Sequence, residues 1–378
     1  MEPVDVLVIG AGIAGASVAY ELAADAEVVL LEREDRPGYH TTGRSAAIYA
    51  PAYGNGPIRK LTQASRAFYE DRAGGLAEAP VLTPRGELLI ARTDQLPALE
   101  AMETALRSEP GDLERIDGKE AVARMPFLRS GHVAAGLVDS RAMDMDVAAI
   151  HQGYLSGFRR RGGRLIVEAE VTGLKPAKSR KSAGWEVQSR AGVFRAAAVI
   201  NASGAWADEV AAIAGARPVG LVPKRRTAFI FDPAAPVDRD WPVVCDVDER
   251  FYFRPESGLL FGSPADETPM PPSDIQPDDL DVAIAIDRIE QATIWQVKRV
   301  TRKWAGLRSF VADRTPVVGM DPEKQGFFWL AGQGGYGIQT APALARVAAA
   351  LVTGRALPDD VLATGLTIHD LAPIRLSS

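Results

Sequence analysis

The sequence is poor in the residue types that form disulfides or bind metals. It has a single cysteine, Cys245, so no disulfide within the chain is possible and a reducing compartment is the expected setting. Its four histidines are scattered along the chain, at His40, His132, His151 and His369. None has a neighbour at the spacing of metal ligands, and we therefore expect no bound metal.

Long apolar runs and an excess of positive charge are missing as well. No stretch reaches the ~18 apolar residues that span a bilayer. The first apolar run is interrupted by Asp5 and by glycines, unlike a signal peptide. The formal net charge of −6 argues against a nucleic-acid partner, because phosphate binding needs concentrated lysine and arginine. These exclusions leave a cytoplasmic protein with a small-molecule substrate and no membrane span.

What is present is an ordinary globular composition, with 47% hydrophobic and 24% charged residues over 378 positions. A chain of this length suits two domains better than one core. The patterns predict helices over 16–24, 57–71, 95–107, 146–161 and 280–296. They predict strands over 4–9, 28–31, 86–90, 164–171, 196–201, 225–231, 243–247, 250–254, 258–262 and 327–331. Residues 175–184 are expected to form a polar turn and 264–277 a polar loop.

The first thirty-two residues have the pattern of a nucleotide-binding strand–helix–strand unit. The apolar run 4–9 leads into Gly10, Gly12 and Gly15, and the second apolar run 28–31 ends in Glu32. The glycines permit a tight turn, close approach of a pyrophosphate and close packing of helix on strand. The glutamate can accept hydrogen bonds from ribose hydroxyls. Together they predict a dinucleotide site.

The segment after Glu32 favours FAD over NAD. Residues 37–47 are rich in glycine and small hydroxyl side chains and lead to an expected helix start near Ser45. Such a segment can place main-chain N–H groups and hydroxyls along a flavin and its phosphates. Taken alone, it could also be an ordinary surface loop. Near the other end of the chain, the run 327–331 leads into Gly332, Gly334, Gly335 and Gly337. That loop lets the main chain approach a planar ligand, and the helix after it can stabilise negative charge.

These motifs resemble those of the FAD-dependent D-amino acid oxidase and glycine oxidase superfamily, over nearly the whole chain. Within it, the chain resembles the bacterial D-arginine dehydrogenases. The resemblance implies an α/β protein, in which a Rossmann-like FAD-binding domain is interleaved with a mixed-sheet α+β substrate domain. It implies FAD-binding segments at 1–47, 140–222 and 304–378, and substrate-binding segments at 48–139 and 223–303. FAD is expected to be bound without a covalent bond.

The resemblance also implies which residues contact FAD. They are Gly10, Gly12, Ile13, Ala14, Gly15, Glu32, Arg33, Thr42, Gly43, Arg44, Ser45, Ala46, Ala47, Val171, Ala202, Gly204, Trp206, Gly306, Arg308, Gly334, Gly335, Tyr336, Gly337, Ile338, Gln339 and Thr340.

For a substrate carboxylate, Arg225 and Arg308 are the candidates. Two guanidinium groups can hold a carboxylate with charge-assisted hydrogen bonds. Arg225 begins a strand whose alternation places it on one face with Phe229 and Phe231, while Arg226 faces away. Taken alone, an arginine is more often a surface or ion-pair residue. The resemblance favours the carboxylate role for Arg225 and Arg308.

Three further candidates rest on the resemblance. Tyr53 and Tyr252, which alone would be packing aromatics, correspond to walls and hydroxyl donors of the substrate pocket, and Gly335 adjoins them. Glu87, which alone would be a solvent-facing strand residue, corresponds to the acid that receives the cationic side chain of the substrate. A carboxylate there would attract arginine or lysine. Ile48, Ala50 and Val243 depart from the group's histidine, threonine and thioether residue, which makes the pocket more apolar.

The resemblance therefore implies oxidative deamination of a D-amino acid, D-arginine or D-lysine by preference. Hydride transfer from Cα to FAD would give an imino acid that water converts to a 2-oxo acid and ammonia. Arg225, Arg308, Tyr53 and Tyr252 are the candidate catalytic residues, and no residue stands out as a general base. Three alternatives stay open: oxidation of a secondary amine or imino acid, oxidation of a 2-hydroxy acid, and FAD binding without catalysis. A dehydrogenase would need an electron acceptor such as a quinone or a carrier protein.

Overall fold

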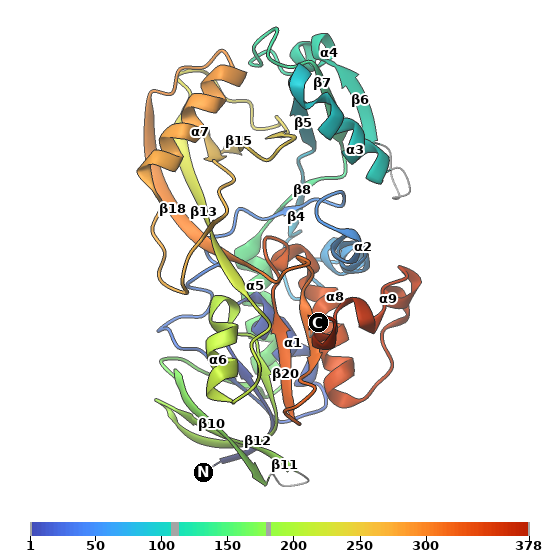
Figure 1. Ribbon diagram of the computed structural model, residues 1–378, viewed down its shortest axis with the longest axis vertical. Helices are drawn as coiled ribbons and strands as arrows, with labels where there is room; N and C mark the ends of the chain where they lie inside the picture. Colours follow the sequence, from blue (N-terminus) through green and yellow to red (C-terminus); the bar gives the residue numbers. More distant parts are fainter. Residues whose placement is uncertain (1, 107–112, 179–182, 377–378) are drawn as a thin grey trace.

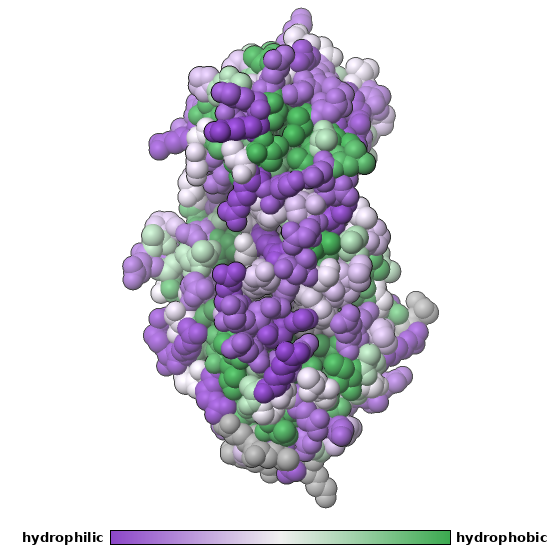
Figure 2. Space-filling view, turned by 90° about the vertical axis from the view of Figure 1, so that its left-hand side faces the viewer, coloured by the Kyte–Doolittle hydropathy of each residue, from purple (hydrophilic) through white to green (hydrophobic). Residues whose placement is uncertain are grey.

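The computed structural model describes residues 2–106, 113–178 and 183–376. The molecule is elongated, with two regions along its long axis, and both chain ends lie in the lower region of Figure 1. Figure 2 views the left-hand side of Figure 1 and shows mostly hydrophilic side chains, with an apolar patch in the upper region. None of the helices described is both long and apolar enough to cross a membrane.

The lower region is built on an eight-stranded sheet. Its strands are β1 (Glu2–Ile9), β2 (Val28–Leu31), β9 (Arg164–Ile166), β10 (Val171–Lys178), β11 (Ala183–Ser189), β12 (Gly192–Asn201), β19 (Val317–Met320) and β20 (Phe327–Ala331). The order is β10-β11-β12-β1-β2-β9, and β20 pairs with β12 and with β19. The pairs β12–β1, β1–β2, β2–β9 and β12–β20 are parallel.

Helices cover both faces of this sheet, which explains why β1 is apolar at nearly every position. On one face, Val6 and Val8 pack into a core shared with α1 (Ile13–Leu22), α5 (Val147–Arg160) and α8 (Gly337–Thr353). On the other, Leu7 and Ile9 pack into a core shared with α6 (Ala207–Ile213). The carboxyl ends of β1 and β2 therefore meet the N-terminus of α1 at one edge.

The upper region is built on a nine-stranded mixed sheet. Its strands are β5 (Glu87–Ala91), β6 (Leu113–Asp117), β7 (Ala135–Asp139), β13 (Val222–Asp232), β14 (Val243–Asp246), β15 (Tyr252–Glu256), β16 (Leu259–Ser263), β17 (Thr268–Pro269) and β18 (Arg299–Phe310). The order is β17-β13-β16-β15-β14-β5-β7-β6, with β18 paired to β13. The helices of this region are α3 (Leu96–Leu106), α4 (Gly118–Arg124) and α7 (Asp279–Ala292).

Aromatic side chains fill the core of the upper region. Phe229 and Phe231 of β13, Phe251 and Phe253 around β15, and Trp295 after α7 are all buried in one cluster. The apolar face of α7, including Val282, Ala285 and Ile289, packs into the same cluster. One face of β13 therefore lies against this core, and the opposite face is left for other contacts.

The two regions are joined by several crossings of the chain. A three-stranded sheet of β3 (Ile48–Tyr49), β8 (Met143–Met145) and β4 (Leu82–Pro84) lies between them, beside α2 (Gly56–Glu70), while α9 (Asp359–Ala363) packs on α2. The long pair β13 and β18 runs from the upper region toward the lower one (Figure 1). The domain boundary expected at residue 304 falls inside β18.

Three local expectations differ from the structure. No helix begins near Ser45, because residues 41–44 form turns and Ala47 leads directly into β3. The strand expected over 164–171 is two strands, β9 and β10, separated by a bend where Glu168 has φ +52°. Lys175 to Lys178, expected in a polar turn, continue β10, and residues 179–182, expected in the same turn, lie outside the described residues.

Candidate functional site

The turn between β1 and α1 depends on two close main-chain approaches. Gly10 has φ +98°, and a Cβ on it would lie 2.6 Å from the main-chain oxygen of Ala202. A Cβ on Gly15 would lie 1.8 Å from the main-chain oxygen of Gly10. Only glycine satisfies both positions. The turn closes tightly enough to leave the N-terminus of α1 facing an adjacent groove, where an anion is favoured.

Glu32 is held at the end of β2 by main-chain donors. The N–H of Ala11 donates to its Oε2 at 2.9 Å, and the N–H of Glu34 donates to its Oε1 at 3.0 Å. The side chain is buried, which fixes the carboxylate against the glycine turn. Two carboxylate oxygens offer about four acceptor positions, so capacity remains for the hydroxyl groups of a ribose.

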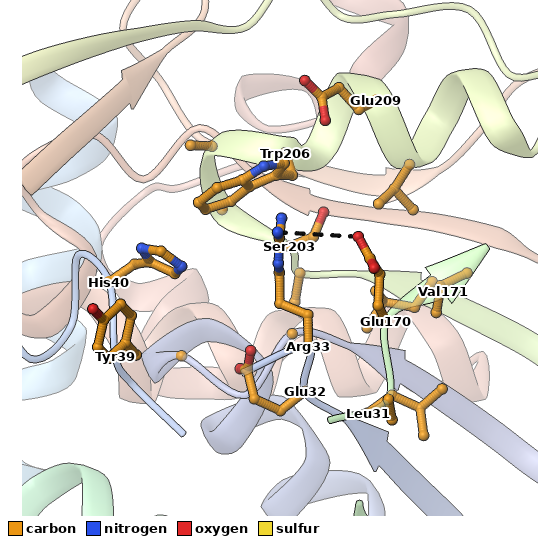
Figure 3. Close-up of a pocket in the computed structure, with 18 of the residues that line it drawn as sticks. Leu31, Glu32, Arg33, Tyr39, His40, Glu170, Val171, Ser203, Trp206 and Glu209 are labelled. Carbon is orange, nitrogen blue, oxygen red and sulfur yellow. Dashed lines mark ion pairs between the residues drawn. The ribbon is translucent and has the colours of Figure 1, made fainter. Parts of the chain in front are cut away.

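A groove runs along this edge of the sheet (Figure 3). The residues expected at FAD that line it are Gly10, Gly12, Glu32, Arg33, Thr42, Val171, Ala202, Gly204 and Trp206. Arg33 extends across the groove toward Trp206, with its Cζ atom 4.8 Å from the centre of the indole ring. Its Nη2 lies 4.0 Å from Oε1 of Glu170. The stacked guanidinium and indole give this section planar walls that suit a flat heterocycle.

Thr41 and Thr42 also line a second section, which continues the groove past the start of α1. The residues expected at FAD that line the second section are Ile13, Thr42, Arg44, Ser45, Ala46, Gly306, Arg308, Gly334, Gly335, Gly337 and Ile338. Gly334 has φ +54°, and a Cβ on Gly335 would lie 2.7 Å from Nη1 of Arg308. Because these positions have no side chain, the main chain of the glycine-rich loop itself forms this part of the groove wall.

The two sections together match the parts of a flavin dinucleotide. The first offers an acid for a ribose and flat walls for an adenine, and the N-terminus of α1 between the sections offers a place for phosphates. In the second section, α8 begins at Gly337, and its N-terminal dipole can stabilise negative charge on a flavin ring. The side chains and main-chain groups present therefore fit FAD.

A cavity of about 930 Å³, open mouth included, adjoins the second section. Several residues line both spaces: Ser45, Ala46, Arg226, Tyr252, Arg308 and Gly335. The cavity also contains Tyr53 and Glu87, together with Ala47 and Gln339. All but one of the residues expected to bind the substrate are thus brought together beside the second section of the groove, which is called the flavin section below.

The exception is Arg225, whose side chain lies on the other face of β13. It shares that face with Phe229 and Phe231, which pack into the core under α7. Its Nη2 donates to Asp281 of α7 at 2.6 Å, and its Nε donates to Asp266 at 3.2 Å. Arg226, which was expected to face away from the site, lines the cavity instead. The place expected for Arg225 therefore belongs to Arg226.

Arg226 and Arg308 lie on the same face of two paired strands. Arg226 of β13 is opposite Gly306 of β18, and Arg308 is two residues further along. Such diagonal neighbours are within reach of long side chains. Nη1 of Arg308 donates to the hydroxyl of Tyr53 at 3.2 Å. Burial raises the pKa of Tyr53 well above its usual value of 10.0, so this hydroxyl keeps its proton at neutral pH.

Glu87 and Cys245 form a pair in the cavity wall away from the groove. The thiol of Cys245 donates to Oε1 of Glu87 at 3.3 Å, across the parallel pair β14–β5. Burial raises the pKa of Glu87 from 4.5 to about 7, and the thiol hydrogen bond acts in the opposite direction. The negative charges of Asp139 and Glu249 add to the increase. Near pH 7 this acid is therefore poised between its neutral and charged forms.

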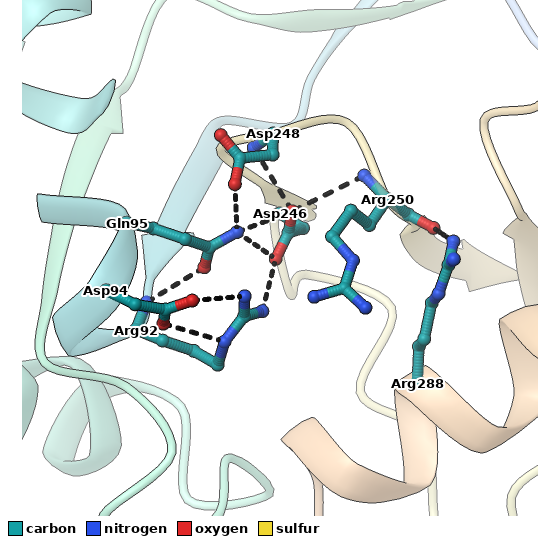
Figure 4. A network of polar contacts seen from close by, with 7 residues as sticks. All are labelled: Arg92, Asp94, Gln95, Asp246, Asp248, Arg250 and Arg288. Carbon is teal, nitrogen blue, oxygen red and sulfur yellow. Dashed lines mark hydrogen bonds and ion pairs between the residues drawn. The ribbon is translucent and has the colours of Figure 1, made fainter. Parts of the chain in front are cut away.

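A turn between β14 and β15 brings a second acid, Glu249, to the cavity. The turn is held by Asp246, which is 1% exposed (Figure 4). Nε2 of Gln95 donates to both carboxylate oxygens of Asp246, at 3.0 and 3.1 Å, and Arg92 approaches within 3.4 Å. Arg288 of α7 donates to the main-chain oxygen of Arg250 at 2.7 Å. This network fixes the main chain of the turn that carries Glu249.

Five of the residues expected at FAD do not line the groove or the cavity. Ala14, Gly15, Tyr336 and Thr340 line neither the groove nor the cavity, and Gly43 lines a neighbouring surface hollow. Tyr336 packs on Tyr53, with ring centres 4.9 Å apart. The polar cavity residues that were not candidates from the sequence are Arg226, Cys245, Asp246 and Glu249. In the described part of the chain, no three His, Cys, Asp or Glu side chains gather as metal ligands.

Comparison with known proteins places this arrangement in a family. A family model described as FAD dependent oxidoreductase matches residues 5–351. Human mitochondrial dimethylglycine dehydrogenase is 26% identical over 265 residues, 68% of this chain and 30% of that protein. The chain thus spans less than a third of the dimethylglycine dehydrogenases that it matches. Sarcosine oxidase subunit beta of Rhizobium meliloti is 26% identical over 334 residues, 84% of this chain and 77% of that protein.

The solved structure of glycine oxidase from Geobacillus kaustophilus has a TM-score of 0.82 and 23% identity, covering 98% of this chain and 100% of that one. This likeness confirms the expected fold, a Rossmann-like FAD-binding region interleaved with a mixed-sheet region. The family match extends from β1 to α8 and so includes both glycine-rich loops of the groove. The chain belongs to the FAD dependent oxidoreductase family, and FAD is its cofactor.

Proposed function

We propose that this chain oxidises the Cα–N bond of an amino acid, and that its preferred substrates are cationic D-amino acids, D-arginine or D-lysine. The observation that carries the proposal is the distribution of charge in the cavity. Arg226 and Arg308 line the side shared with the flavin section, and Glu87 lines the wall away from it. A long cationic amino acid has the complementary charges at its two ends. The D configuration rests on the resemblance to the D-arginine dehydrogenases.

The carboxylate of the substrate would bind to the two arginines. Guanidinium groups donate paired, charge-assisted hydrogen bonds to a carboxylate, which fixes its orientation as well as its position. Arg308 lies so close to Gly335 that a Cβ there would be 2.7 Å from its Nη1. The arginines would thus hold Cα at the boundary between the cavity and the flavin section.

When bound, FAD supplies the acceptor for the hydride that leaves Cα. The amine must give up its proton first, because its lone pair forms the C=N bond as the hydride departs. The resulting imino acid reacts with water to give a 2-oxo acid and ammonia. Tyr53 keeps its proton, so it would act as a hydrogen-bond donor to the carboxylate and not as a base. Tyr252 lines the same boundary and would be a second donor.

A second candidate is oxidation of a secondary amine or imino acid. The relatives named for dimethylglycine and sarcosine support it, as does the partly neutral state of Glu87 near pH 7. Ala46, Ile48, Leu89, Met102 and Val243 make much of the cavity wall apolar. Such a wall would accept a proline ring or methyl groups. The carboxylate-binding arginines would serve this reaction, or oxidation of a 2-hydroxy acid, in the same way.

Anaerobic mixing with a substrate panel tests the proposal. The FAD-loaded protein is mixed with D-arginine, D-lysine, D-proline, sarcosine and L-2-hydroxyglutarate, and loss of flavin absorbance is followed. We expect the fastest bleaching with D-arginine or D-lysine. Fastest bleaching with D-proline or sarcosine would establish the second candidate. Bleaching by no amino, imino or hydroxy acid would contradict both and favour an FAD-binding protein without catalysis.

The electron acceptor is a separate part of the proposal. By resemblance we propose a dehydrogenase that passes electrons to a quinone or a carrier protein, with FAD held non-covalently. Dye reduction compared with peroxide formation under air, for the same substrate, measures which acceptor is used. Peroxide formed at the rate of dye reduction would identify an oxidase. FAD remaining attached to the chain after acid precipitation would contradict non-covalent binding.

A further inference from the structure

The guanidinium group of Arg226 is held by the loop between β16 and β17. Its Nε donates to the main-chain oxygen of Asp266 at 3.0 Å, and its Nη2 approaches Oε1 of Glu267 at 3.4 Å. Both contacts lie along one edge of the planar group. Across residues 2–106, 113–178 and 183–376, no hydrogen bond or ion pair engages Nη1. The protein therefore engages Nε and Nη2 of Arg226, and Nη1 remains available to a ligand in the cavity.

Glu267 itself is fixed by two further cations. Nζ of Lys224 donates to its Oε2 at 2.8 Å, and Arg314 donates to both oxygens, at 2.9 and 2.7 Å. The Arg314 and Lys224 hydrogen bonds lower the pKa of Glu267 to about 2 against the opposing effect of burial, so it is ionised at any working pH. A carboxylate with three cationic neighbours has little freedom to rotate.

The loop separates the two neighbouring arginines by function. The carboxylate of Asp266 accepts hydrogen bonds from the side chain of Arg225 and from the main-chain N–H of Thr227, which fixes the loop to β13. The carboxylate of Glu267, the next residue, accepts the hydrogen bond from Arg226 on the cavity face of β13. Arg226 is 7% exposed, so most of its side chain is enclosed by protein and the Glu267 contact is shielded from water.

We propose that Glu267 is a positioning residue for Arg226: it orients the guanidinium group so that Nη1 meets the carboxylate of the substrate. The inference rests on the proposed function, because it assumes a substrate carboxylate at Arg226. Glu267 touches neither substrate nor cofactor in this account. Glu267 restricts the rotation of the Arg226 side chain before the substrate binds, so less side-chain entropy is lost on binding. Its contribution therefore appears in the affinity for carboxylates and not in the rate of the chemical step.

The test compares Glu267→Gln with the unaltered protein, both loaded with FAD. Benzoate, a carboxylate without an amine, is titrated, and its dissociation constant is read from the change in the flavin spectrum. Because one charge-assisted contact is lost, we expect that constant to rise about tenfold in Glu267→Gln. The KM for the best substrate should rise by the same factor, with kcat nearly unchanged. Glu267→Asp keeps the charge and should fall between the two.

Asp279→Asn is the matched control. Asp279 of α7 forms an exposed ion pair with Lys303 of β18, so the change removes a carboxylate–lysine pair without touching Arg226. Its benzoate constant should equal that of the unaltered protein. FAD content and unfolding temperature are measured for each variant, and Glu267→Asp carries the comparison if Glu267→Gln does not fold. Benzoate binding as tight in the Glu267 variants as in the control would overturn the positioning role. If the unaltered protein does not bind benzoate, the KM comparison decides the positioning role; bleaching of the flavin by no amino acid would contradict the proposed function itself.

Discussion

The two ends of the cavity beside the flavin section are built in different ways. At the arginine end, Arg226 is tied to Asp266 and Glu267, and Arg308 lies against Gly335 and donates to Tyr53. At the acid end, the one hydrogen bond that the Glu87 side chain forms with a described residue is the thiol contact from Cys245, at 3.3 Å. Chemistry at Cα needs fixed geometry. Recognition of a side chain tolerates a looser contact, and the acid end has a charge that responds to pH.

The largest effect that separates the two ends is expected at the arginine end. Arg226→Met should raise the KM for the preferred substrate about a hundredfold or more, because it removes a guanidinium from the carboxylate. Arg225→Met removes the same charge from the next residue but faces the core. It should leave KM within about threefold while lowering the free energy of unfolding by about 3 kcal/mol, because Asp266 and Asp281 lose the guanidinium group that they share. Steady-state kinetics and denaturant unfolding measure the two effects.

The opposite pattern would restore the sequence-based assignment. A large increase in KM for Arg225→Met, with Arg226→Met near normal, would show that the carboxylate lies on the other face of β13. The two variants make the same substitution and remove the same charge. A difference in KM between them therefore reports which arginine faces the substrate carboxylate.

A smaller effect is expected from the thiol at the acid end. Cys245→Ala removes the hydrogen bond that stabilises the charged form of Glu87, so the pKa of Glu87 should move above about 7. The pH at which kcat/KM for a cationic substrate begins to rise should move upward with it, and KM at pH 7 should rise about threefold. Cys245→Ser keeps a donor and is the control. Identical pH profiles for the two variants would remove the thiol from this role.

A separate effect is expected on stability, and its size depends on pH. The pKa of folded Glu87, about 7, is above its ordinary value of 4.5, so the ionised form is disfavoured in the folded protein. The resulting loss of folding free energy is absent below pH 4.5 and reaches its full value above pH 7. Glu87→Gln should therefore raise the unfolding free energy at pH 8 by roughly 1–3 kcal/mol and leave it unchanged at pH 4.5. A destabilised variant at pH 8 would mean that Glu87 is already stabilised as a carboxylate.

The cofactor groove was predictable because its signals are local. Gly10, Gly15 and Glu32 belong to one short unit in which each residue has a steric or hydrogen-bonding role that the spacing reveals. The glycine-rich loop before α8 is equally compact. Ser45 shows the limit of such signals: hydroxyl and glycine residues indicated a helix start, but pairing of β3 with β8 draws the chain into a strand.

The substrate cavity was only partly predictable, because its residues come from distant segments. The error at Arg225 arose from reading the face with Phe229 and Phe231 as the cavity face. Large aromatics in alternation mark the core side of a half-buried strand. The cavity side of β13 is the one with Arg226 and the small Ala228. Cys245 and Glu249 gave no local signal, because only the pairing of β14 with β5 brings them to Glu87.

The most direct test of the account compares D-arginine with D-citrulline, which has the same length and shape but a neutral end. Anaerobic bleaching of the flavin is measured at pH 8 for both compounds, in the unaltered protein and in Glu87→Gln. We predict that kcat/KM for D-arginine exceeds that for D-citrulline by at least about tenfold, since a charge-assisted contact contributes about 1.5 kcal/mol or more. In Glu87→Gln the two values should converge. Equal values in the unaltered protein would contradict a cavity built for opposite charges at its two ends.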